Sequence, residues 1–213
     1  MHEVSERTDE ELFEAWRGGD AAAGTALFER YFDPLYRFLR GKVLAVDDLL
    51  QQTFLACVKR KDALRDGAKF RSYMFTVARH ELFEHWRQRK KRAGDVDVGE
   101  LSIKDLGTSP SGVVARQAEH RLLLRALQSI PLDLQIALEL HYWEGMTGPE
   151  LAEVLEIPEG TVRSRLRRAQ EALEAAMTEL AEDPESLAST RADLDKWAAS
   201  LARVVHEGKR AAG

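Results

Sequence analysis

The segment "TGPELAEVLEIPEGTVRSRLRRAQ" (Thr147–Gln170) decides how the C-terminal half of the chain folds. Thr147 and Glu150 have the spacing of a capping box, which predicts the start of a helix. The pattern breaks at Glu156-Ile157, and Pro158 then starts a second helix. Two helices joined by so tight a turn predict a helix-turn-helix, whose shared core is expected from Leu151, Leu155, Ile157, Val162 and Leu166.

The second of these helices has two chemically different faces. On a helical wheel Val162, Leu166 and Ala169 fall together and predict a buried stripe, while Arg165 falls toward its edge. The opposite arc is basic and polar, and arginine forks suit guanine edges and phosphates. The alternative is an ordinary solvated face, although such faces usually mix charge signs. The candidate DNA-binding residues are Gly160, Thr161, Arg163, Ser164, Arg167 and Arg168.

One residue departs from the usual turn. Glu156 occupies the position where helix-turn-helix turns favour glycine, because the backbone there tends to positive φ. A glutamate in that conformation costs about 1 kcal/mol, so the turn is expected to differ in detail.

Composition excludes several classes of protein. The 213 residues are 44% hydrophobic and 31% charged, with a formal net charge of -5. Long apolar runs and a secretory signal are lacking, so a cytoplasmic location is expected. The single cysteine, Cys57, excludes an internal disulfide and a multi-cysteine zinc site. Scattered histidines and the lack of a phosphate-binding loop predict a chain that is not an enzyme and has no cofactor or metal.

The fold class predicted from periodicity is all-α, with two small helical domains joined by an acidic flexible linker. Four helices are expected in residues 1–92; Thr8 opens the first, and Pro34 kinks or restarts the second. Residues 93–115 have the composition of a linker, and 116–178 form the second domain. Basic residues concentrate at "RQRKKR" (Arg87–Arg92) and on the helix described above.

Residues 179–213 form a C-terminal extension that is expected to be an amphipathic helix. Leu187, Leu194, Trp197, Leu201 and Val204 or Val205 lie near one helical face. Packing on the second domain and an autoinhibitory or partner-binding role are both open.

The chain resembles the extracytoplasmic-function (ECF) group of bacterial RNA polymerase sigma factors. The resemblance rests on "ALFERYFDPLYRFLR", "VDDLLQQTFLACV", "FRSYMFTVARHELFEHWRQRKKR" and the stretch from "LQSIP" to "AQEAL", in the family's order. It implies two domains that bind core RNA polymerase through its beta-prime and beta subunits and read the -10 and -35 elements of promoter DNA. It also implies an anti-sigma factor as partner, and no membrane insertion. A conventional helix-turn-helix regulator is the alternative, but it gives the first domain no purpose.

Two segments of the first domain carry the implied contacts. "DDLLQQTF" resembles the helix that docks on the beta-prime coiled coil, which implies core-polymerase binding by Asp48, Leu49, Gln51, Gln52 and Phe54; for Leu49 and Phe54, a place in the hydrophobic core is equally open. "GAKFRSYMFTVARH" resembles the segment that melts and reads the -10 element, which implies DNA binding by Lys69, Phe70, Arg71, Tyr73, Arg79 and His80. Phe70 and Tyr73 could equally be core residues. His80 and Tyr73 stand where the family often has asparagine and tryptophan. The linker resembles one that approaches the polymerase active site and RNA exit, but a solvated tether explains it as well.

Overall fold

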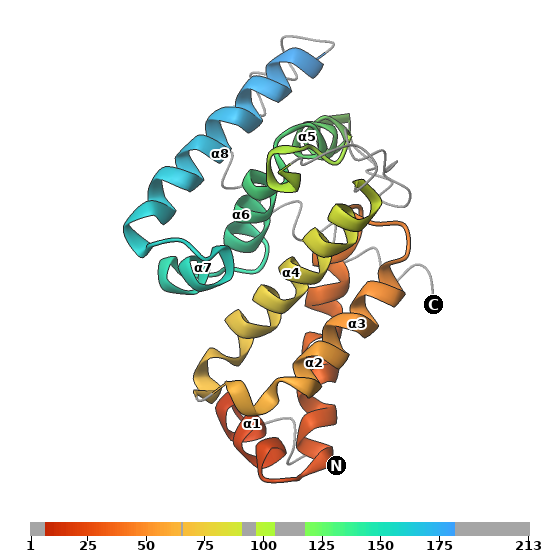
Figure 1. Cartoon of the computed structure of the whole chain (residues 1–213). Coiled ribbons are helices and arrows are strands. Elements are labelled where there is room, and N and C mark those ends of the chain that lie inside the picture. The colour runs from red at the N-terminus through yellow and green to blue at the C-terminus, as the bar shows by residue number, and fades with distance from the viewer. Residues whose placement is uncertain (1–6, 65, 91–96, 105–117, 182–213) are drawn as a thin grey trace. The chain divides into compact units, whose positions relative to one another are not determined.

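The computed structural model describes residues 7–64, 66–90, 97–104 and 118–181 (Figure 1). The α-helices are α1 (Asp9–Arg17), α2 (Ala21–Leu39), α3 (Val46–Lys59), α4 (Phe70–Lys90), α5 (Ala118–Ser129), α6 (Leu132–Tyr142), α7 (Gly148–Leu155) and α8 (Glu159–Leu180). Short 3-10 turns lie at η2 (Lys61–Ala63), η3 (Gly67–Lys69) and η4 (Val98–Glu100). The described parts contain two isolated bridge pairs but no strand, which confirms the all-α prediction.

Contacts divide the chain into two compact units, Met1–Arg89 and Lys90–Gly213. The extension 179–213 lies outside the described residues beyond Ala181, so its helix stays a prediction. Within the described ranges, no helix has the length and apolar character needed to cross a membrane.

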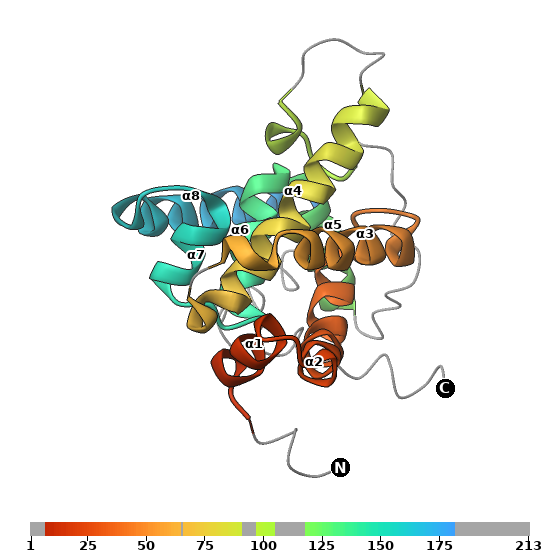
Figure 2. The same ribbon diagram turned by 60° about the horizontal axis from the view of Figure 1, so that its bottom comes forward.

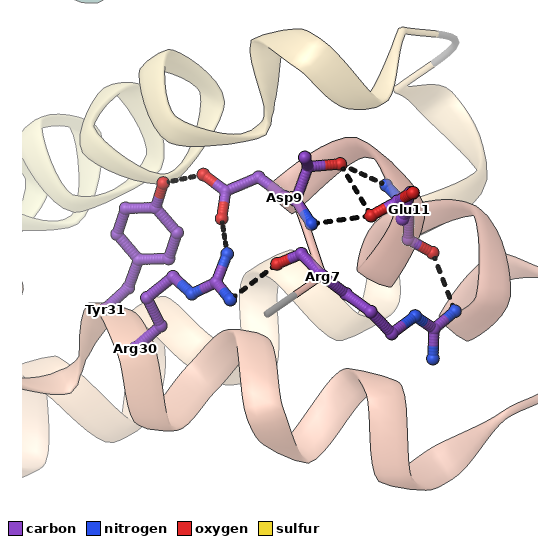
Figure 3. Close-up of polar contacts among 6 residues, drawn as sticks. Arg7, Asp9, Glu11, Arg30 and Tyr31 are labelled. Atoms are coloured by element: carbon purple, nitrogen blue, oxygen red, sulfur yellow. Dashed lines mark hydrogen bonds and ion pairs between the residues drawn. The ribbon is translucent and has the colours of Figure 1, made fainter. Parts of the chain in front are cut away.

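In the first unit, hydrogen bonds and an ion pair connect α1 to α2 (Figure 3). The predicted capping box is present, because the Thr8 backbone N–H donates to the Glu11 carboxylate at 2.7 Å and the Glu11 N–H donates to the Thr8 hydroxyl at 3.2 Å. One step along, the Asp9 carboxylate accepts from the Arg30 guanidinium at 2.5 Å and from the Tyr31 hydroxyl. Burial, followed by this hydrogen bond, raises the pKa of Tyr31. The start of α1 is therefore held in place on the middle of α2, which lies beside it in Figure 2.

Aromatic rings fill the space between α1, α2 and the start of α4. The Phe70 ring is fully buried, with its centroid 5.4 Å from Phe13, 6.3 Å from Trp16 and 5.8 Å from Tyr31. Gly24 makes room for this cluster, because a Cβ there would lie 2.4 Å from the Trp16 ring. The cluster fixes the first turn of α4, where several candidate DNA-binding residues lie.

The second helix continues through its proline. Pro34 removes one backbone donor, which is why a kink or restart was expected. The structure gives one helix from Ala21 to Leu39, with Leu27, Leu35 and Leu39 fully buried on either side of the proline. The predicted restart is therefore wrong, because packing of the apolar stripe keeps the helix continuous.

In the second unit, α5 and α6 pack against the long helix α8. Their core is aliphatic and contains Leu123, Leu127, Leu138, Leu173 and Met177, each at most 5% exposed. The helix α7 precedes α8 and contacts both α6 and α8. This core presents the first half of α8 as one side of the unit (Figure 1).

Residues 97–104, inside the predicted linker, pack on the second unit; we call this segment the strap. The Leu132 N–H donates to the Leu101 carbonyl at 2.9 Å, and the Lys104 N–H donates to the Gln128 carbonyl at 3.1 Å. Val98 and Ile103 are buried. A flexible linker was predicted here because the segment lacks helical periodicity. The difference arises because two apolar side chains and a few backbone hydrogen bonds anchor a segment without periodicity.

Candidate nucleic-acid interface

The helices α7 and α8 and the tight turn between them form the predicted helix-turn-helix. The backbone N–H and the hydroxyl of Thr147 each donate to the Glu150 carboxylate at 2.8 Å, which closes the first turn of α7. Glu156 follows α7 with φ 55° and ψ 43°, and it is the one non-glycine residue with positive φ among those described. The turn was expected to differ in detail because a glutamate replaces the usual glycine. That expectation is wrong, because Glu156 adopts the left-handed conformation that is usual at this position. This conformation lets the Ile157 N–H reach back to the Ala152 carbonyl at 3.1 Å and reverses the chain within three residues.

The two faces of α8 differ as the helical wheel predicted. Val162, Ala169 and Leu173 are at most 5% exposed and lie against the other helices. Leu166, predicted to be in the core, is only half-buried. The residues predicted to bind DNA are all exposed, namely Gly160, Thr161, Arg163, Ser164, Arg167 and Arg168. A helix held by its apolar stripe thus presents a basic and polar surface.

The arginines on α8 have different surroundings. Arg165, at the edge of the stripe, forms an ion pair with Asp133 of α6 at 3.4 Å, with both side chains about three-quarters buried. Arg167 lies 3.8 Å from Glu171, but both side chains are more than 60% exposed. Arg163 and Arg168 have no ion-pair partner among the described residues. Three guanidinium groups on the exposed face are therefore available to a polyanion, and Arg165 is bound within the protein.

Two smaller groups keep this surface open. A Cβ placed at Gly160 would meet no atom within 4 Å, so internal packing does not require a glycine there. The Ser164 hydroxyl donates to the Thr161 carbonyl at 2.8 Å, which leaves its oxygen free to accept a hydrogen bond. The start of α8 therefore allows close approach of a ligand to the backbone.

The candidates on α4 fall into two sets. Lys69, just before α4, is exposed; Arg71, in the first turn of α4, is half-buried; and His80, in the middle of the helix, is exposed. The half-buried Arg79 has its guanidinium 4.5 Å from the Phe83 ring centroid. Phe70, by contrast, is fully buried in the aromatic cluster, which corrects its interpretation as a DNA-contacting residue. Its ring has no exposed surface on which a base could stack.

Tyr73 has an intermediate environment. Its side chain is half-buried, and burial raises the pKa of its hydroxyl. The buried hydroxyl oxygen has no hydrogen-bond partner among the described residues. The Tyr73 side chain is therefore partly accessible, while its hydroxyl lies inside the protein.

The predicted polymerase-docking residues also divide by burial. Asp48, Gln51 and Gln52 are exposed on α3. Leu49 is 2% exposed and belongs to the core, while the half-buried Phe54 has its ring 4.9 Å from Phe28.

Sequence reasoning missed part of the exposed face of α3. Leu55 and Val58 are 50% and 45% exposed and lie on the same side of the helix as Gln51. The sequence places both on the broad apolar faces of this helix. Apolar character alone does not distinguish a core from a docking surface. The available signal was an excess of apolar positions in α3 over what one buried stripe requires.

Comparison with known proteins matches each of the two units to a separate region of one protein family. Residues 27–92 match the model for sigma-70 region 2, and residues 120–173 match the model for sigma-70, region 4. The chain belongs to the ECF group of the sigma-70 family. Similar proteins are the RNA polymerase sigma-H factor of Pseudomonas aeruginosa (28% identical; 83% of this chain and 97% of the relative) and the ECF RNA polymerase sigma-E factor of Escherichia coli (27% identical; 78% and 93%).

Solved structures give the same fold. Similar structures are CnrH in complex with the cytosolic domain of CnrY (TM-score 0.58, 20% identity, 80% of this chain and 97% of that chain) and the sigma factor RpoE in complex with the anti-sigma factor NepR from Bartonella quintana (TM-score 0.52, 20% identity, 71% and 92%). In this sigma factor, α3 and α4 lie within the region 2 match. The region 4 match ends at residue 173, so the last turns of α8 and the extension lie outside it.

Proposed function

We propose that this ECF sigma factor binds core RNA polymerase through its first unit, reads the -10 element with α4 and reads the -35 element with α8. The observation that carries the proposal is the face of α8, where three exposed arginines lie opposite a buried apolar stripe. Arginine in the major groove donates two hydrogen bonds to guanine or binds backbone phosphate. The rigid attachment of α8 supplies the fixed orientation that base reading requires.

For the -10 element we retain Lys69, Arg71, Tyr73, Arg79 and His80. The cationic groups attract the backbone of a separated strand, and the half-buried Tyr73 offers an aromatic ring for stacking. Phe70 supports this site by packing beneath it.

For the polymerase we retain Asp48, Gln51 and Gln52 on α3, and we add Leu55 and Val58. An interface gains most from apolar side chains buried at its centre, with polar groups around them. The exposed face of α3 has this composition. Leu49 and Phe54 shape the helix from inside and are not proposed as contacts.

A protein partner of the anti-sigma class is also proposed. Both similar structures are complexes of a sigma factor with another protein, and one partner is an anti-sigma factor. The binding site of this partner can be located by co-purification. Variants of the chain that carry charge substitutions on the first unit or on the second unit would be compared for loss of the partner.

Reconstituted transcription tests the proposal. Core polymerase with this chain should start transcription at specific sites on genomic fragments, and core alone should not. Arg163→Ala should lower the yield of transcript, whereas Arg125→Ala, an exposed arginine on α5, should not. Gln52→Ala should weaken binding to core polymerase. Tight sequence-specific binding by the free chain, with no binding to core polymerase, would support a conventional regulator instead.

A further inference from the structure

An apolar groove lies on the second unit between α5, α6 and α8. It is lined by Leu123, Leu127, Leu138, Tyr142, Trp143 and Leu173, together with the polar side chains Glu139 and Gln170. The leucines form its floor and are nearly fully buried, while Tyr142 and Trp143 are half-buried at the rim. Gln170 completes the rim, where its amide donates to the Tyr142 hydroxyl at 2.5 Å. An apolar groove with an aromatic rim is suited to receive an aliphatic helix face.

The sequence places a matching face directly after α8. Leucines recur every seventh residue across the end of α8 and the segment that follows it, at Leu166, Leu173, Leu180, Leu187, Leu194 and Leu201. Pro184 divides this series in the middle, and α8 ends just before it, at Leu180. A seven-residue leucine repeat indicates helices that pack side by side. The proline indicates that the two halves of the series belong to two separate helices.

The chain between α8 and Leu187 is long enough for the second half of the leucine series to reach the groove. Leu173, in the groove, lies eight residues before Ala181, which corresponds to about 12 Å along α8. Residues 182–186 can span at most about 17 Å when extended. Leu187 can therefore begin a returning segment anywhere between Leu180 and Leu173.

Charge also favours a segment that returns along α8. The second half of α8 is acidic, with Glu171 and Glu179 exposed. A segment running back along α8 brings Arg191, at the edge of the leucine face, toward these carboxylates, while Lys196, Asp193 and Asp195 lie away from that face. An ion pair of Arg191 is exposed and weak, but it favours the antiparallel orientation over a continuation away from the unit.

We infer that residues 187–204 return as a helix antiparallel to α8 and bury their leucine face in the groove between α5, α6 and α8. The occupant is this chain's own C-terminal segment. The inference is independent of promoter recognition. It assigns to the second unit a helix that follows α8, and it makes the groove unavailable to any other helix while that helix is bound.

Hydrogen exchange of the full-length chain tests the inference. Amides of 187–204 should exchange at least about tenfold more slowly in the wild type than in Leu194→Glu, because docking must open before they exchange. Ala199→Glu is the matched control, since Ala199 lies opposite the leucine face on a helical wheel and should keep the protection. Trp143→Ala, at the groove rim, should remove the protection of 187–204 while the amides of α8 stay protected.

Several results would overturn the inference. Equally fast exchange in the wild type and in Leu194→Glu would mean that the segment does not dock. Protection of 187–204 that survives both Trp143→Ala and Gln170→Lys would mean that the segment docks elsewhere. If Trp143→Ala also exposes the amides of α8, the result for Gln170→Lys alone is used. Protection that falls on dilution, together with a dimer in light scattering, would mean that the groove holds the segment of a second copy.

Discussion

Arg167→Ala should weaken promoter binding by the holoenzyme and lower its salt dependence, whereas Arg165→Ala should not change the salt dependence. The Arg167 side chain is 72% exposed, and its neighbour Glu171 is 62% exposed. Such a surface pair contributes little to folding, so the guanidinium is free to bind phosphate. Arg165 is 22% exposed and is held by Asp133.

The expected size follows from counterion release. One lost phosphate contact lowers the slope of log affinity against log salt by about 0.9. Between about 50 and about 200 mM salt, the ratio of wild-type to Arg167→Ala affinity should therefore change about 3.5-fold. For Arg165→Ala the slope should remain, and the free energy of unfolding should fall by about 0.5–1 kcal/mol because the ion pair with Asp133 is lost.

The assay is promoter binding by reconstituted holoenzyme at several salt concentrations, with thermal unfolding of each variant. The reasoning is refuted if Arg167→Ala keeps the wild-type slope, or if Arg165→Ala reduces it equally. Either result would mean that the exposed face of α8 is not the one that meets DNA.

Three further outcomes are expected. Gly24→Ala should lower the free energy of unfolding by about 1–3 kcal/mol because its Cβ would clash with Trp16, whereas Gly160→Ala should leave it unchanged or raise it by up to about 1 kcal/mol; equal effects in thermal unfolding would contradict the packing described. Burial raises the pKa of Cys57 to about 12, so at pH 8 the folded chain should be alkylated at least about tenfold more slowly than the unfolded chain, and equal rates measured by mass spectrometry would show an accessible thiol. His80→Ala should reduce open-complex formation, measured by permanganate footprinting, and leave core binding unchanged, because His80 is exposed; a parallel loss of core binding would indicate a structural role.

Features determined by neighbouring residues could be predicted from the sequence. The capping boxes of α1 and α7 and the two faces of α8 depend on residues within one or two turns of helix. Spacing along the chain is enough to find such features.

Features determined by distant contacts could not be predicted in the same way. Phe70 is in the core because rings from α1 and α2 surround it, and neither helix is near it in sequence. Leu55 and Val58 are apolar but exposed, since the other faces of α3 already fill the space beside α2. The strap is ordered by the end of α5 and the start of α6, which follow it by some thirty residues.

The strap also shortens the free connection between α4 and the second unit. If all of 91–117 were a free connection, Lys90 and Ala118 could be separated by up to about 95 Å. With the strap on α6, only residues 91–96 connect α4 to the second unit, and their reach is at most about 25 Å. The eight residues of the strap therefore shorten the extended length of the connection between α4 and the second unit about fourfold.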